Sequence, residues 1–73
     1  MMQQVRNIND LSRREIENLI DEWIHNARNR RILRRRLIDG VRFEPLAEEF
    51  DLSVTQVKHI VYNARRRLAQ HIK

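Results

Sequence analysis

The chain lacks cysteine altogether, and its 73 residues include one glycine, one proline, two phenylalanines, one tryptophan and one tyrosine. Without cysteine it has no means of forming disulfides or Cys-based metal sites. Scarce glycine and proline suit helices better than sheets. No apolar run approaches the roughly 20 residues of a membrane span, and the first residues lack the pattern of a signal peptide. We therefore expect a small all-α domain of four helices, located in the cytoplasm and without a membrane partner.

Positive charge is in excess. Lysine and arginine total 15 against 10 aspartates and glutamates, which gives a formal net charge of +5. Such an excess on a small chain favours a polyanionic partner, and the clustering of the arginines argues against a role in solubility alone. A chain of this length buries only about 60% of its unfolded surface, so it has one small core and little room for a deep pocket. We expect neither a cofactor nor a small-molecule substrate.

The beginning of the chain divides into a tail and a capped helix. We interpret residues 1–10 as a flexible tail and residues 11–73 as a single helical domain. Ser12 and Glu15 have the spacing of a capping box, which predicts a helix that starts at Arg13.

This first helix has an apolar and an acidic side. Its apolar stripe consists of Ile16, Leu19, Ile20, Trp23, Ile24 and Ala27, and the acidic residues Glu15, Glu17, Asp21 and Glu22 lie off that stripe. Trp23 stands in the middle of the stripe, so we expect it to anchor the core. The acidic side should face away from a polyanion.

A second helix is expected over residues 27–39, after a break at Asn26 and before Gly40, because glycine suits the left-handed residue that ends helices. Its apolar pattern is poorer than that of the first helix. Ile32, Leu33 and Leu37 share one side, with Arg36 inside that arc and Ile38 outside it. The packing of this helix is therefore the least defined by the pattern.

The arginines of the second helix have different expected roles. We expect the stem of Arg36 to cover apolar surface and its guanidinium to meet Glu44, Glu48 or Glu49. The others surround the helix and cannot all reach one phosphate backbone. Two or three of them are expected to touch a polyanion such as DNA, and the pattern does not say which among Arg28, Arg30, Arg31, Arg34 and Arg35.

A helix-turn-helix is predicted over residues 43–68. Its short helix covers residues 44–50, with Pro45 in the first turn, where a missing amide hydrogen costs nothing. Asp51 follows at the turn, because aspartate tolerates a positive φ. Ser53 to Gln56 repeats the capping box in its glutamine form and starts a long helix over residues 54–71.

The long helix has a buried side and a hydrogen-bonding side. Its apolar stripe is Val57, Ile60, Val61, Ala64, Leu68 and Ile72, and Thr55, Gln56, His59, Asn63 and Arg66 fall on the opposite arc at 100° per residue. Such a helix fits the major groove, with its first turns at the base edges. We expect base contacts from Thr55, Gln56 and His59, and phosphate contacts from Lys58, Asn63, Arg65 and Arg66.

Two of these side chains, and the neighbouring Tyr62, have more than one interpretation. Thr55 and Gln56 are also placed to serve only the helix cap, and a glutamine folded back to its cap is less free to read a base. Tyr62 borders the same face, where it either packs on a neighbouring helix or donates to a phosphate.

Residues 40–72 resemble region 4 of the sigma-70 family. The matching features are Gly40, Phe43, Leu46 to Glu48, Ser53, Val57, Ala64, Arg65 to Arg67 and Leu68. The resemblance implies a helix-turn-helix that contacts a promoter element and RNA polymerase. It implies base contacts at Val54, Thr55, Gln56 and His59, with Lys58 and Arg66 near the backbone.

The sequence also departs from the sigma pattern. Asp51 stands where glycine is usual, and Val54 cannot hydrogen-bond. A chain of 73 residues is not expected to contain the promoter-melting region of a complete sigma factor. It looks more like the small sigma-like regulators carried by phages and mobile elements.

Two other classes of protein compete with this one. An enzyme is not expected, because His25, His59 and His71 are scattered and neither an H-E-x-x-H motif nor a Gly-rich phosphate loop is present. The alternative is a protein-interaction or phage assembly module, similar to a terminase small subunit, that docks through its acidic first helix and binds DNA weakly or not at all. The target sequence, activation or repression, a homodimer and polymerase contact stay open.

Overall fold

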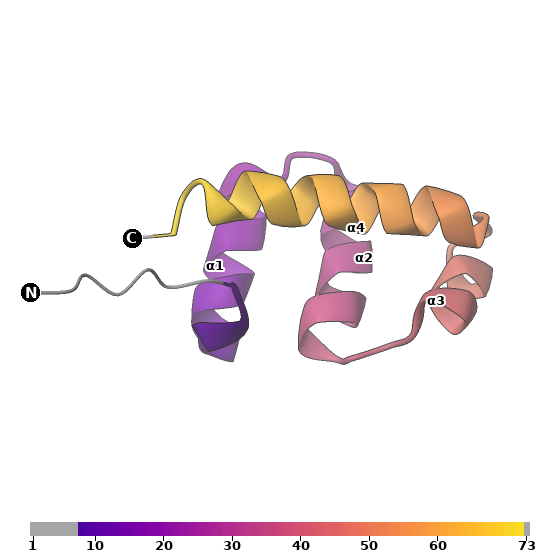
Figure 1. The fold of residues 1–73 in the computed structure, drawn as a ribbon, viewed down its shortest axis with the longest axis horizontal. Helices are drawn as coiled ribbons and strands as arrows, with labels where there is room; N and C mark the ends of the chain where they lie inside the picture. Colours follow the sequence, from indigo (N-terminus) through magenta and orange to yellow (C-terminus); the bar gives the residue numbers. More distant parts are fainter. Residues whose placement is uncertain (1–7, 73) are drawn as a thin grey trace, which may run out of the picture.

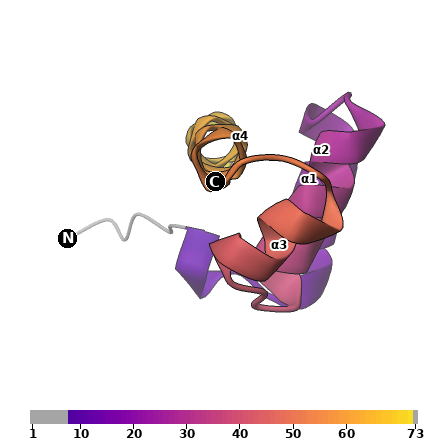
Figure 2. The ribbon, with the colours of Figure 1, turned by 90° about the vertical axis from the view of Figure 1, so that its right-hand side faces the viewer.

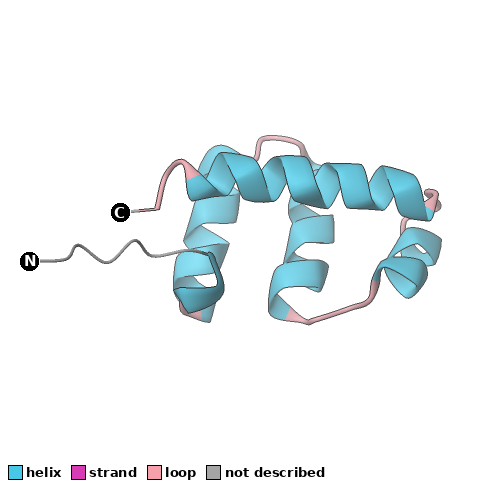
Figure 3. Cartoon of the chain, viewed as in Figure 1, coloured by secondary structure: helices cyan, strands magenta, loops and turns pink. Residues whose placement is uncertain are grey.

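A computed structural model describes residues 8–72. Its elements are a 3-10 turn at Ile8–Asp10, α1 at Arg13–Trp23, α2 at Ala27–Leu33 continuing as the π-helical turn η2 at Arg34–Ile38, α3 at Phe43–Glu49 and α4 at Val54–Ala69. No strand occurs among these residues (Figure 3). The predicted all-α fold of four helices is confirmed.

The long helix α4 lies across α1, α2 and α3 and contacts all three (Figure 1). Seen along its axis, the other helices all lie to one side of it (Figure 2). The core fills the space between, and its most enclosed side chains are Ile20, Ile32, Leu33, Leu46, Val57, Val61 and Leu68. The opposite side of α4 is left open. Among residues 8–72, no helix is both long and apolar enough to cross a membrane.

Both predicted capping boxes are present. In α1 the Ser12 hydroxyl accepts from the Glu15 amide at 3.2 Å, and a Glu15 carboxylate oxygen accepts from the Ser12 amide at 3.0 Å. Each box satisfies two of the amide groups that a helix start leaves without partners. α1 and α4 therefore start at the predicted residues, Arg13 and Val54.

Part of the predicted N-terminal tail is docked on the core. Ile8 to Asp10, assigned above to the flexible tail, form a 3-10 turn, and Ile8 is only 7% exposed. Ile8 lines a hollow together with Ile16 and Ile38, so burial of its side chain holds this turn against the core. The rest of the expected tail, residues 1–7, lies outside the described residues.

Trp23 packs against the core, as predicted, from a position at its edge. It is half-buried, whereas Ile16, Ile20 and Ile24 of the same stripe are buried. Its indole ring stacks on the His71 imidazole, with centroids 3.5 Å apart and planes 2° from parallel.

The long helix ends before His71, the residue that stacks on Trp23. α4 ends at Ala69 rather than 71, and the His71 amide bonds the Leu68 carbonyl three residues back at 3.0 Å. Beyond Ala69 the chain is thus free to turn its imidazole toward α1.

The π-helical turn explains why the second helix has a poor pattern. The amide of Asp39 donates to the carbonyl of Arg34, five residues back, at 3.1 Å. The wider turn shifts the side-chain register by about one residue relative to an α-helix. Leu37 and Ile38 are therefore both half-buried, although the sequence pattern places Ile38 off the apolar side.

The ion pairs of this turn also differ from the prediction. Arg35, and not Arg36, reaches Glu49, at 2.9 Å, and it also pairs with Asp39 at 3.1 Å. Arg36 donates to the Val41 carbonyl at 3.0 Å and lies over the Phe43 ring at 4.2 Å. The expected pairing of Arg36 with a carboxylate is wrong, but its role is structural, as predicted.

Gly40 ends this helix with φ of +72°, and nothing lies within 4 Å of the position that a Cβ atom would take there. Substitution at this position tests backbone conformation without a steric clash. We expect Gly40→Val to lower the free energy of unfolding by about 1–2 kcal/mol. Gly40→Asn should cost less than half as much, because asparagine tolerates a left-handed backbone. Urea denaturation compares the two; equal losses would contradict this explanation.

Candidate nucleic-acid interface

A tight turn sets α3 against α4. The amide of Leu52 donates to the Ala47 carbonyl at 2.9 Å, and the amide of Asp51 donates to the Glu48 carbonyl at 3.2 Å, which together make a Schellman ending for α3. Asp51 has φ of 55°, the left-handed conformation predicted for it. The four residues from Phe50 to Ser53 thus join a short helix to a long one.

The outward arc of α4 holds most of the predicted contact residues. Its apolar stripe is turned inward, with Val57, Val61, Ala64 and Leu68 all buried. The exposed side chains on the opposite side include Thr55, His59, Asn63 and Arg66. The structure therefore brings these four together on one open surface.

Gln56 is exposed, but its amide is already engaged. The Gln56 side-chain oxygen accepts from the Ser53 backbone amide at 2.9 Å, and the Ser53 hydroxyl accepts from the Gln56 amide at 3.1 Å. A bidentate bond to adenine needs both the oxygen and the nitrogen of a glutamine side chain. While the cap is closed, Gln56 offers only its NH2 group as a donor. The capping role is confirmed, and base contact stays a prediction.

Val54 differs from the other predicted base contacts. It is half-buried and packs against the core, whereas Thr55 beside it is exposed. Its apolar side chain stabilises the start of α4 in this position. Val54 therefore exposes a smaller fraction of its surface than Thr55 does.

One flank of α4 carries an aromatic and cationic cluster. The exposed Tyr62 meets the Phe43 ring of α3 edge-on, with centroids 5.9 Å apart, and keeps 51% of its surface accessible. The Lys58 ammonium lies 5.7 Å from the same Phe43 ring. Tyr62 thus packs on α3, which is one of its two predicted roles. Its hydrogen bond to a phosphate stays a prediction. Arg65 is half-buried.

Among the arginines whose contacts the sequence pattern left open, Arg30, Arg34 and Arg35 each bond to another part of the fold. Arg30 donates to the carbonyls of Ile24 and His25 at 3.0 and 2.9 Å, which ties the α1–α2 connection to α2. Arg34 pairs with Asp21 of α1. Hydrogen bonds with Glu49, and then with Asp39, raise the pKa of the Arg35 guanidinium above its ordinary value. Neither Arg28 nor Arg31 forms an ion pair within residues 8–72.

The charge on α4 has one sign. This helix carries Lys58 and Arg65 to Arg67 and no acidic residue. None of these four cations forms an ion pair with any residue in the described range. Acidic residues lie instead on α1 and α3, and Glu17 and Asp21 of α1 pair with arginines. A positive surface without internal neutralisation attracts a polyanion.

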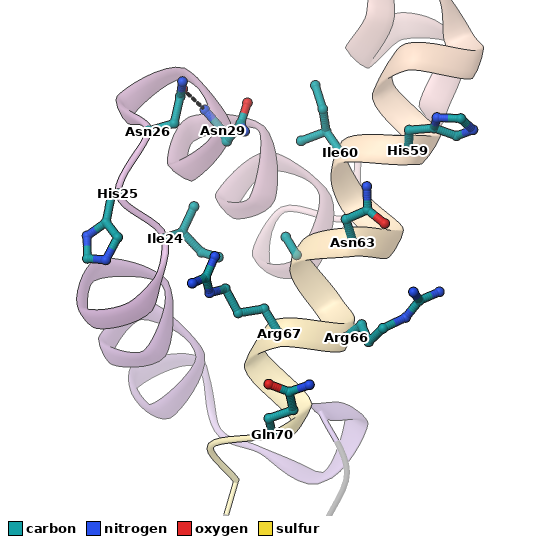
Figure 4. Close-up of a pocket in the computed structure, with 11 residues that line it drawn as sticks. Ile24, His25, Asn26, Asn29, His59, Ile60, Asn63, Arg66, Arg67 and Gln70 are labelled. Atoms are coloured by element: carbon teal, nitrogen blue, oxygen red, sulfur yellow. Dashed lines mark hydrogen bonds between the residues drawn. The ribbon is translucent and has the colours of Figure 1, made fainter.

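The sequence pattern predicts no DNA contact for Arg67. In Figure 4 its side chain extends from α4 toward the α1–α2 connection, while Arg66 and His59 point away from that connection. Three successive arginines on a helix must point in three directions, about 100° apart. This spacing indicates that Arg67 points to a different side of α4 from Arg65 and Arg66. It does not indicate which element lies on that side.

No metal site emerges from the described residues, since no three His, Asp or Glu side chains among them come together. Comparisons with known proteins find no matching family model, no matching curated protein and no matching solved structure. The resemblance of residues 40–72 to sigma-70 region 4 therefore stays a prediction.

Proposed function

We propose that this chain binds duplex DNA by placing the start of α4 in the major groove. The observation that carries this proposal is the open side of α4, where polar and cationic side chains meet and no carboxylate of the helix opposes them. The major groove admits an α-helix, and the first turns of the inserted helix reach the base edges.

The contact residues have separate roles under this proposal. Thr55, His59 and the NH2 group of Gln56 read base edges near the start of the helix. Phosphates are bound by side chains further out on the arc and on its flank, namely Lys58, Asn63, Arg65 and Arg66. Val54 contributes at most an apolar contact, because it cannot hydrogen-bond.

Transcription regulation is the proposed setting, and it follows from the resemblance to sigma-70 region 4. A single small domain with few base contacts binds weakly. Recruitment to RNA polymerase or pairing of two copies on adjacent half-sites supplies the missing affinity.

A protein-interaction module is the second candidate, and one feature of α1 favours it. A shallow hollow on α1 and the end of the chain is lined by apolar and acidic side chains, among them Leu11, Leu19, Glu22 and Ile72. Such a surface suits a partner with a basic, apolar segment. Under this candidate the cationic surface of α4 has no role in duplex recognition.

The salt dependence of binding separates the two candidates. A duplex binder making about six phosphate contacts should lose affinity by roughly 10³-fold between 50 and 200 mM salt. Fluorescence anisotropy with a labelled 30-base-pair duplex, titrated at several salt concentrations, measures this slope. Absence of duplex binding even at 50 mM salt would reject the DNA proposal in favour of the interaction module.

A further inference from the structure

A groove runs between α4, from His59 onward, and the α1–α2 connection (Figure 4). It encloses about 620 Å³, comparable to a small-molecule site, but it lies on the surface and not within the core. Apolar side chains, including Ile24 and Ile60, contribute to its lining, and Asn26, Asn29 and Arg67 are among its polar residues. It flanks the outward arc of α4 on the side away from Lys58.

The charge around the groove is positive. Arg66 and Arg67 both line it, and no carboxylate does among the described residues. Arg67 extends toward the α1–α2 connection, and neither arginine forms an ion pair within residues 8–72. A cationic groove without a carboxylate is suited to an anion.

The wall opposite α4 presents hydrogen-bond donors. The Asn26 side-chain oxygen accepts from the Asn29 backbone amide at 3.0 Å, and the Asn29 side-chain oxygen accepts from the Arg28 guanidinium at 3.2 Å. Because those partners can only donate, each asparagine must turn its oxygen toward them and keep its NH2 group for another acceptor.

Carbonyl oxygens of the same connection are already satisfied. Arg30 binds the carbonyls of Ile24 and His25. Two acceptors that would repel an anion are thus engaged by a cation. Arg66, Arg67 and the NH2 groups of the two asparagines then supply donors at the groove, and such donors match the oxygen atoms of a phosphate.

We infer that this groove holds a segment of the DNA backbone, bound by Arg67, Asn26 and Asn29. The inference rests on the proposed function and adds a second anchor to it, contributed partly by the α1–α2 connection. An α-helix is about as wide as the major groove, so the two phosphate backbones run along its two flanks. Lys58 and Arg65 face one backbone, and this groove takes the other. Contacts of this kind hold register and carry no sequence information.

Asn26→Asp is the sharpest test, because it changes the groove and keeps the cap of α2. Aspartate caps a helix as well as asparagine does, so the thermal midpoint should not fall. The substitution replaces an NH2 donor with a carboxylate that faces the proposed phosphate. We expect binding to a random-sequence 30-base-pair duplex at 50 mM salt to weaken by about tenfold or more.

Arg67→Gln tests the opposite wall, with Arg14→Gln as its matched control. Both substitutions remove one positive charge, but Arg14 is exposed on α1 and does not line the groove. Arg67→Gln should reduce the slope of log affinity against log salt by about 1, and Arg14→Gln should leave it nearly unchanged.

The outcomes distinguish duplex binding by α4 from backbone binding by the groove. Reduced affinity in Asn26→Asp and a smaller slope in Arg67→Gln, with Arg14→Gln like wild type, support the groove. If wild type binds the duplex but both groove variants match the Arg14→Gln control, the groove inference is overturned and the role of α4 stands. If wild type does not bind duplex DNA, both fall together.

Discussion

Replacing Gln56 by glutamate is expected to weaken binding to a selected duplex by about ten- to a hundredfold without destabilising the fold. Glutamate serves a capping box as well as glutamine, so the hydrogen bond from the Ser53 amide is retained. A carboxylate at the start of a helix also interacts favourably with the helix dipole. The thermal midpoint should therefore equal or exceed that of wild type.

The loss of binding has a separate cause. The cap engages the side-chain oxygen of Gln56, whereas no described residue accepts from its NH2 group, which stays available to a base. Glutamate removes that donor and places a negative charge beside the phosphates. The variant therefore separates the two roles of one residue, which Gln56→Ala does not do, because alanine also opens the cap.

The measurement pairs thermal unfolding with anisotropy titrations on a selected and an unrelated duplex. Glu15→Gln in the capping box of α1 is the matched control, since it makes the reverse exchange at a box that lies outside the proposed interface. Wild-type affinity in Gln56→Glu would restrict Gln56 to its capping role.

Lys58→Ala should weaken binding to both duplexes alike, because it removes a phosphate contact.

Features set by near neighbours in the chain could be predicted from the sequence. The capping boxes at Ser12 and Ser53, the left-handed residues Gly40 and Asp51, and the inward stripe of α4 all depend on residues within a few positions of one another. Local hydrogen bonds and helical periodicity determine these features, so the pattern contains the information.

The π-helical turn could not be predicted in this way. Its five residues are three arginines, a leucine and an isoleucine, which fit an ordinary α-helix equally well. The turn brings Leu37 and Ile38 to the core together, so the gain lies in packing against other elements. In the same turn Arg35, and not Arg36, pairs with Glu49.

Contacts between α1 and the residues after α4 could not be predicted from the sequence pattern either. Trp23 and His71 are far apart in the sequence and meet only because α4 crosses α1. The groove depends on the same crossing, which sets Arg67 opposite Asn26. Relations of this kind follow from tertiary packing, and periodicity alone does not specify the crossing of two helices.

Leu46→Ala is expected to have the largest effect on stability, lowering the free energy of unfolding by about 2–5 kcal/mol. Leu46 is fully buried, and it is one of only two buried residues on α3. A helix of seven residues is not stable by itself, so α3 depends on this packing. A chain of this size has roughly 4–11 kcal/mol of stability in total, so the loss is a large part of it.

The consequence for the interface follows from the position of α3. This helix backs the start of α4, which presents Thr55 and Gln56, so a loosened α3 leaves those turns without support. Duplex affinity should then fall even at temperatures where most of the chain stays folded. Glu48→Ala is the control on the same helix, since Glu48 is exposed, and it should change stability by no more than about 0.5 kcal/mol. Urea denaturation of both variants decides the point: a loss below about 1 kcal/mol for Leu46→Ala would mean that α3 does not pack as described.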